Sequence, residues 1–109
     1  MRRRTASLAI LALPALLVRA ALAAPSSSAS SVTIYGASWC GPCHHLQDAL
    51  RARGVPYDYI DVDRYPDLHD RAKQATGTSA IPVTSVAKGG SLFWIVGADA
   101  DAVERAYRG

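Results

Sequence analysis

The two cysteines of this 109-residue chain, Cys40 and Cys43, are separated by only two residues. They fall where a strand is expected to give way to a helix. Residues 32–35 form a short β-branched and aromatic run that predicts a strand. Pro42 suits the first turn of a helix, where its missing N–H is not needed. A strand that leads directly into a helix with a Cys-x-x-Cys pair at its start constrains the fold more than any other feature.

The rest of the chain alternates between strand and helix patterns. Strand patterns occur at residues 57–62, 83–86 and 92–96. Helix patterns begin at Pro42, Pro66 and Asp99. The order β-α-β-α-β-β-α implies at least one parallel strand pair, and a Lys-Gly-Gly turn at residues 88–90 adds an antiparallel hairpin. We therefore predict an α/β fold in which a small mixed four-stranded sheet is packed with three helices.

Residues 1–23 have the pattern of a secretory signal peptide. Three arginines at positions 2–4 precede an apolar run at 6–18, and Ala-Leu-Ala at 21–23 is a cleavage site. The apolar run is shorter than the roughly 20 residues of a membrane span. We predict a Ser-rich linker at 24–31 and a folded domain at 32–109.

This leader predicts export, with the bacterial periplasm as the leading compartment and no membrane association after cleavage. A mitochondrial transit peptide is the alternative, because the segment is rich in arginine and free of acidic residues. Loss of the leader lowers the count of basic residues from 12 to 8, against nine acidic residues. The mature chain would carry a formal charge of −1, so its composition gives no indication of nucleic-acid binding.

The Cys pair could be a disulfide staple, a metal site or a haem attachment site. A staple across so short a loop stabilises by only about 2 kcal/mol, against over about 4 kcal/mol for a loop that spans most of a domain. The Cys-x-x-Cys-His pattern fits haem, but the only methionine is Met1, in the leader. His44 and His45 point about 100° apart on a helix, which suits one metal ion poorly, and His69 is expected on a solvated helix face. We predict no metal site, with an exported metal- or haem-handling protein as the alternative function.

The position of the pair at a helix start favours redox chemistry instead. Free N–H groups and the positive end of the helix dipole stabilise a thiolate there. Lowering a thiol pKa from about 8.5 to about 7 raises the thiolate from a few per cent to about half at neutral pH. We predict that Cys40 attacks a substrate disulfide and that Cys43 resolves the mixed disulfide. Such a reaction requires no cofactor beyond the cysteines.

The segment Trp39-Cys40-Gly41-Pro42-Cys43 is identical to the active-site pentapeptide of thioredoxins. The chain around it, from residue 32 to about 107, resembles a glutaredoxin in its size, its opening strand VTIYGAS and its second strand YDYIDVD. The resemblance implies a thioredoxin fold and a monomeric thiol–disulfide oxidoreductase. Its substrates would be protein disulfides or dithiols, with an unidentified redox donor or acceptor as partner.

The same resemblance implies roles for residues around the cysteines. Ile81-Pro82 is similar to the cis-proline dipeptide that faces the Cys pair and binds the substrate peptide or glutathione. Trp39 would offer a flat apolar docking surface. Gly41-Pro42 and His44 would modulate the pair, since a protonated imidazole nearby favours a thiolate.

Three regions of the sequence depart from the families that the chain resembles. Ile34 stands where thioredoxins carry a buried aspartate that assists proton transfer. Residues 36–38 lack the lysine with which many glutaredoxins hold a glutathione carboxylate. Ile-Val rather than Gly-Gly precedes Gly97, although Asp99 or the helix N-terminus that it caps could hold the other end of a ligand. Glutathione therefore enters as an alternative co-substrate, and a glutathione-dependent glutaredoxin of an organelle is the second alternative function.

Overall fold

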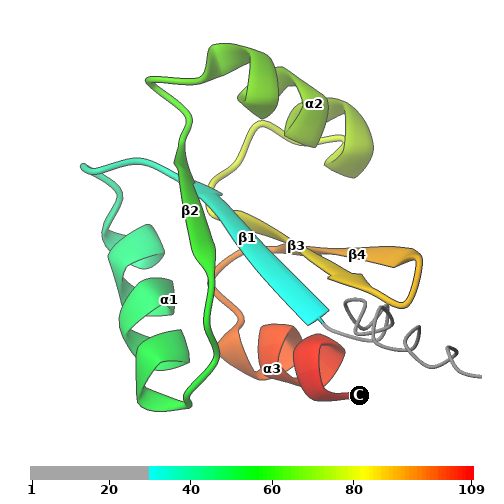
Figure 1. The fold of residues 1–109 in the computed structure, drawn as a ribbon. Helices are drawn as coiled ribbons and strands as arrows, with labels where there is room; N and C mark the ends of the chain where they lie inside the picture. Colours follow the sequence, from blue (N-terminus) through cyan, green and yellow to red (C-terminus); the bar gives the residue numbers. More distant parts are fainter. Residues whose placement is uncertain (1–29) are drawn as a thin grey trace, which may run out of the picture.

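The computed structural model describes residues 30–109 (Figure 1). Its elements are β1 (Ser30–Gly36), α1 (Gly41–Ala52), β2 (Asp58–Asp61), α2 (Pro66–Thr76), β3 (Val83–Lys88), β4 (Ser91–Val96) and α3 (Ala100–Arg108). The predicted order of four strands and three helices is confirmed. The predicted signal peptide at 1–23 and most of the predicted linker lie outside the described residues. None of the helices in residues 30–109 has the length and apolarity needed to cross a membrane.

The strands form one mixed sheet in the order β2-β1-β3-β4, with β1 parallel to β2 and the other two pairs antiparallel. β1 begins at Ser30, two residues before the predicted start of the domain. Ser30 and Ser31 pair with Lys88 and Ala87 of β3. The Ser-rich composition predicted a linker, but the ladder uses backbone groups, which serine supplies as well as any other residue.

The hydrophobic core lies between the sheet and two of the helices. Alternation along β1 directs Val32 and Ile34 to one face, where the core also contains Leu46, Leu50, Val86 and Val103. α1 and α3 cover this face, and α2 lies on the other side of the sheet, where it contacts β4 (Figure 1). The residues Val83 and Ser85, which alternate with the core positions of β3, are also buried.

The helix cap at Asp99 and the hairpin turn after Lys88 form as predicted from the sequence. Asp99 caps α3, and its Oδ1 accepts a hydrogen bond from the Ala102 amide at 3.0 Å. Gly89 and Gly90 have φ values of 58° and 85° and close the β3–β4 hairpin with the two-residue turn that favours positive φ.

His69 is not on a solvated helix face, which corrects the expectation from the sequence. It lies one turn before Ala72, the buried residue of α2, and so lies on the same, inward-facing side of that helix. Its Nε2 atom is enclosed and has no hydrogen-bond partner among residues 30–109.

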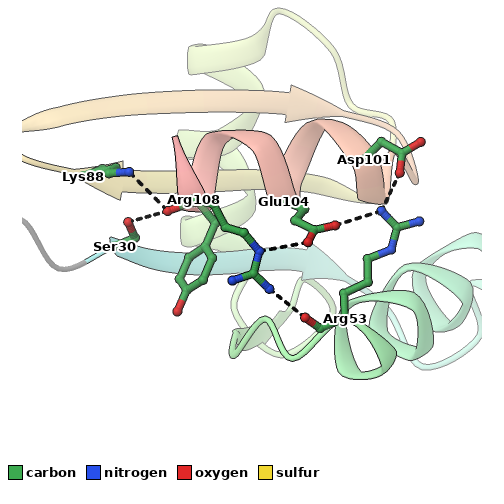
Figure 2. Close-up of polar contacts among 7 residues, drawn as sticks. Ser30, Arg53, Lys88, Asp101, Glu104 and Arg108 are labelled. Atoms are coloured by element: carbon green, nitrogen blue, oxygen red, sulfur yellow. Dashed lines mark hydrogen bonds and ion pairs between the residues drawn. The ribbon is translucent and has the colours of Figure 1, made fainter.

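An ion-pair network ties the end of α1 to α3 (Figure 2). The Arg53 guanidinium donates to Asp101 and, at 3.3 Å, to Glu104. Arg108 donates from Nε to Glu104 at 2.8 Å and from Nη2 to the Arg53 carbonyl at 2.7 Å. Nearby, the Tyr107 carbonyl accepts hydrogen bonds from Ser30 and Lys88, so the start of β1 is joined to the end of α3.

This network makes stability depend on pH in the acid range. A hydrogen bond from Arg53 lowers the pKa of Asp101 below its ordinary 3.8, and one from Arg108 lowers the pKa of Glu104 below 4.5. The folded state then binds fewer protons than the unfolded state, so the stabilisation is complete above about pH 4.5 and is lost as the pH falls through the folded pKa values.

Arg53→Met should therefore lower the melting temperature at neutral pH and weaken its fall under acid, as measured by circular dichroism across a pH series. Arg51→Met is the matched control, because Arg51 pairs with Asp48 on the same helix. An acid profile of Arg53→Met that matches the unmodified protein would contradict the role of the network.

Candidate active site

Cys40 and Cys43 lie at the N-terminus of α1, where the chain turns from β1 into the helix. Cys40 is the N-cap residue, and its Sγ accepts a hydrogen bond from the Cys43 amide at 3.2 Å. The two residues form a disulfide with Cα atoms 5.2 Å apart. On reduction, the Cys40 sulfur is held against a free N–H at the positive end of the helix dipole, an arrangement that stabilises a thiolate.

The two cysteines differ in exposure to solvent. Cys40 is 5% exposed and Cys43 is fully buried. An incoming sulfur atom therefore reaches Cys40 first, which is the asymmetry that the predicted roles of attacking and resolving cysteine require.

Trp39 stands beside the pair and is 70% exposed. Its indole Nε1 donates to Asp63 Oδ2 at 2.7 Å, and the Asp63 amide donates to Asp61 Oδ1 at 2.9 Å. Asp63 was not among the site residues predicted from the sequence. The available signal is its place just after β2, because parallel strands β1 and β2 end at the same sheet edge.

The segment before β3 lies against the Cys pair from another side. Ile81 packs on the cluster that contains Cys40 and Cys43, and the Ile81–Pro82 peptide bond is cis. The buried Pro82 accepts a hydrogen bond at its carbonyl from the Gly97 amide at 2.8 Å. The loop before α3 is thereby joined to this segment, while the Asp99 carboxylate in that loop is engaged as a helix cap.

The residues between and after the cysteines form the outer surface of the helix start. Gly41 and Pro42 are exposed, as are His44 and His45. The His44 ring nitrogen Nε2 donates to the Ser38 carbonyl at 2.6 Å, which links the helix to the loop before Trp39. Within residues 30–109, no group of three His, Cys, Asp or Glu side chains is placed to hold a metal ion.

Gly36 and Tyr59 form the floor beneath Cys43. A Cβ atom on Gly36 would lie 2.7 Å from Cys43 Sγ and 2.9 Å from Tyr59 Cζ. The Tyr59 hydroxyl donates to the Ala37 carbonyl at 3.1 Å. Burial raises the pKa of Tyr59, and the nearby Asp61 and Tyr57 raise it further. Gly36 and Tyr59 were not predicted as site residues, because they come together only when β1 and β2 pair.

Comparison with known proteins places these residues in a family. The family model described as Glutaredoxin matches residues 32–89, more than half of the chain and all of the site up to β3. The chain belongs to the glutaredoxin family. This glutaredoxin is 34% identical over 64 residues to glutaredoxin-like protein NrdH of Salmonella typhimurium, an alignment that covers 59% of this chain and 74% of that protein.

Thioredoxins are also among the relatives. Thioredoxin H2 of Arabidopsis thaliana is 33% identical over 79 residues, covering 68% of this chain but only 57% of that relative. The solved structure of oxidised mitochondrial thioredoxin 3 from Saccharomyces cerevisiae matches with a TM-score of 0.53 at 30% identity, covering 72% of this chain and 76% of that one.

A glutaredoxin structure from Archaeoglobus fulgidus shares the fold, with a TM-score of 0.59 at 22% identity over 73% of this chain and 88% of that one. The thioredoxin fold predicted from the sequence is thus confirmed. With its closed Cys40–Cys43 pair, this glutaredoxin is a thiol–disulfide oxidoreductase.

Proposed function

We propose that this glutaredoxin exchanges disulfides with protein thiols through a mixed disulfide at Cys40. A substrate thiolate attacks Cys40 Sγ, the Cys40–Cys43 bond breaks, and its electron pair stays on Cys43 Sγ. A second substrate thiolate then attacks the substrate sulfur of the mixed disulfide, so the substrate leaves oxidised and the enzyme is left as a dithiol. The reverse sequence reduces a substrate disulfide, with Cys40 attacking and Cys43 resolving.

The difference in exposure between the two cysteines supports this proposal most directly. Only Cys40 has exposed surface, and it occupies the helix N-cap, where a thiolate is best stabilised. Cys43 is fully buried and can react only with a sulfur already bonded to Cys40.

Proteins are the favoured substrates because a large aromatic side chain next to Cys40 is exposed to solvent. This side chain, Trp39, is 70% exposed. Such aromatic side chains are typical of surfaces that bind other proteins. Residues 36–38 carry no lysine for a glutathione carboxylate, so glutathione is the alternative co-substrate rather than the principal one.

Insulin reduction with dithiothreitol as electron donor tests the proposal. The unmodified protein should accelerate precipitation of the insulin B chain, and a Cys40→Ser/Cys43→Ser double variant should match the buffer. A second assay with glutathione and glutathione reductase as the only donor should give slower turnover. Absence of turnover together with stoichiometric binding of a metal ion or haem would instead support the alternative of a metal- or haem-handling protein.

The reduction potential of the Cys pair, measured against a glutathione redox buffer, assigns the direction of the reaction. A value close to the thioredoxin value of about −270 mV indicates a reductant, whereas a value close to about −120 mV indicates an oxidant of exported proteins. The two limits differ by about 7 kcal/mol for two electrons, so the measurement separates them clearly.

We also propose that the protein is exported to the periplasm of a bacterium after cleavage at residue 23. The three-part pattern of residues 1–23 supports this location. Mass spectrometry of the protein recovered from a periplasmic extract should give a chain that begins at Ala24. A mass that retains the leader, or import into isolated mitochondria, would contradict export.

A further inference from the structure

We propose that the Tyr59 hydroxyl donates a hydrogen bond to the Cys43 thiolate whenever the Cys40–Cys43 bond is open. This inference rests on the proposed function, because it concerns the state in which Cys43 leaves the disulfide or attacks a mixed disulfide. It assigns Tyr59 a part in the reaction that neither the pentapeptide nor the cis-proline segment supplies.

The side chains of Tyr59 and Cys43 both lie next to Gly36 at the end of β1. The Cβ position of Gly36 lies 2.7 Å from Cys43 Sγ and 2.9 Å from Tyr59 Cζ, and the Tyr59 oxygen is closer still. Gly36 has no side chain, so the sulfur and the phenol both lie against its bare Cα. Tyr59 is also the register partner of Ile34 on β1, and both side chains pack in the hydrophobic core.

The hydroxyl can change partners without leaving a buried group unsatisfied. In the disulfide form it donates to the Ala37 carbonyl at 3.1 Å. That carbonyl also accepts the Cys40 amide at 3.1 Å, so it keeps one hydrogen bond when the hydroxyl turns away. Rotation about the Cζ–O bond redirects the proton, while the aromatic ring stays in the core.

The Cys43 sulfur needs such a donor when it carries charge. The side chain is fully buried, and burial without a partner strongly disfavours a thiolate. The Cys43 amide already donates to Cys40 Sγ, so it is not free for the sulfur of its own residue. Ile34 stands at the position of the thioredoxin aspartate and offers no polar atom.

The other titratable groups near Cys43 do not serve as the hydrogen-bond donor to its thiolate. Cys40 is its redox partner, and Tyr35 packs on the cysteine cluster from the neighbouring strand position. Asp61 is an acceptor whose charge acts on Tyr59, and the His44 ring is turned to the Ser38 carbonyl. Because the pKa of Tyr59 is raised by burial, its hydroxyl keeps its proton and acts as a donor throughout the pH range of the reaction.

The reaction steps at Cys43 require no further oxidant or reductant. When a substrate thiolate bonds to Cys40 Sγ, the electron pair of the broken bond remains on Cys43 Sγ, which accepts the Tyr59 hydrogen bond. When Cys43 attacks the mixed disulfide, the same pair forms the new bond to Cys40 and the electron pair of the substrate bond leaves with the substrate. Tyr59 returns its hydrogen bond to Ala37 and is unchanged over the cycle.

A titration of Cys43 alone tests the inference. In a Cys40→Ser background, Cys43 is the only cysteine, and its ionisation is followed by the NMR shift of its Cβ across a pH series. Tyr59→Phe should reduce the ionisation constant of Cys43 about tenfold, because a hydrogen bond to a charged group is lost. This readout needs no substrate, so it succeeds or fails independently of the turnover assays of the proposed function.

Resolution of the mixed disulfide gives a second readout, in the protein with both cysteines. Tenfold less thiolate, partly offset by the greater nucleophilicity of a more basic sulfur, should slow resolution at neutral pH about threefold. Tyr57→Phe is the matched control, because the Tyr57 hydroxyl bonds to Gln47 and Arg51 on the outside of α1. An ionisation constant in Tyr59→Phe equal to that of Tyr57→Phe would overturn the inference.

Discussion

Cys40→Ser should reduce disulfide exchange to the uncatalysed rate, whereas Cys43→Ser should complete the first half of the reaction and stop. A serine hydroxyl at neutral pH does not attack a disulfide, and Cys43 alone is fully buried and reaches no substrate. With Cys43 replaced, the Cys40 thiolate still sits at the helix N-terminus and still attacks, but the mixed disulfide has no internal thiol to resolve it.

Intact-protein mass spectrometry after incubation with a peptide disulfide measures both outcomes. Cys43→Ser should gain the mass of one peptide thiol per chain, which dithiothreitol then removes. Cys40→Ser should keep its own mass. The opposite pattern, with a stable adduct in Cys40→Ser only, would reverse the roles of the two cysteines.

Gly36→Ala should destabilise the protein by about 1–3 kcal/mol, the usual cost of overpacking a filled site. The new methyl group would lie 2.7 Å from Cys43 Sγ and nearly as close to the Tyr59 ring, both of which are packed on the core. Either the helix start or the tyrosine must shift to admit it. In a domain of this size each kcal/mol corresponds to a change of about 4–8 °C in the melting temperature.

Gly41→Ala is the matched control for this substitution. Apart from its chain neighbours and the backbone of its own helix, no atom of residues 30–109 lies within 4 Å of a Cβ at Gly41, and alanine is the better helix former. Thermal unfolding followed by circular dichroism should therefore place Gly41→Ala at or above the unmodified protein and Gly36→Ala well below it. Equal melting temperatures for the two variants would show that the floor beneath Cys43 tolerates a side chain.

Local features of the sequence were sufficient to predict much of the fold. Pro42 and Asp99 mark helix starts by what they do to the nearest backbone groups, and the Gly89–Gly90 turn is set by two positive φ values. Each of these residues acts on backbone groups only a few positions away, so its effect can be predicted from the sequence. The redox role of Cys40 and Cys43 could be predicted in the same way, because it depends on the strand and the helix that adjoin them in the sequence.

Contacts between segments that are far apart in the sequence could not be predicted. Asp63 approaches Trp39 only because β1 and β2 are parallel neighbours. Tyr59 and Cys43 both lie beside Gly36 only because a glycine leaves room for them. The first residues of β1 were missed for a related reason. Ser30 has the composition of a linker, and its place in the sheet is decided by its partner Lys88, far along the chain.

The direction of β1 separates the reactive end of the molecule from the end at which the described chain begins. Ser30 stands at one end of this seven-residue strand, and Gly36, which leads to the Cys pair, stands at the other. At about 3.3 Å per residue, roughly 20 Å lie between them. A bead, an electrode or a fused protein joined ahead of Ser30 would therefore leave the end of the molecule that carries Cys40 unobstructed, which makes the Ser30 end the natural attachment point for a reusable immobilised catalyst.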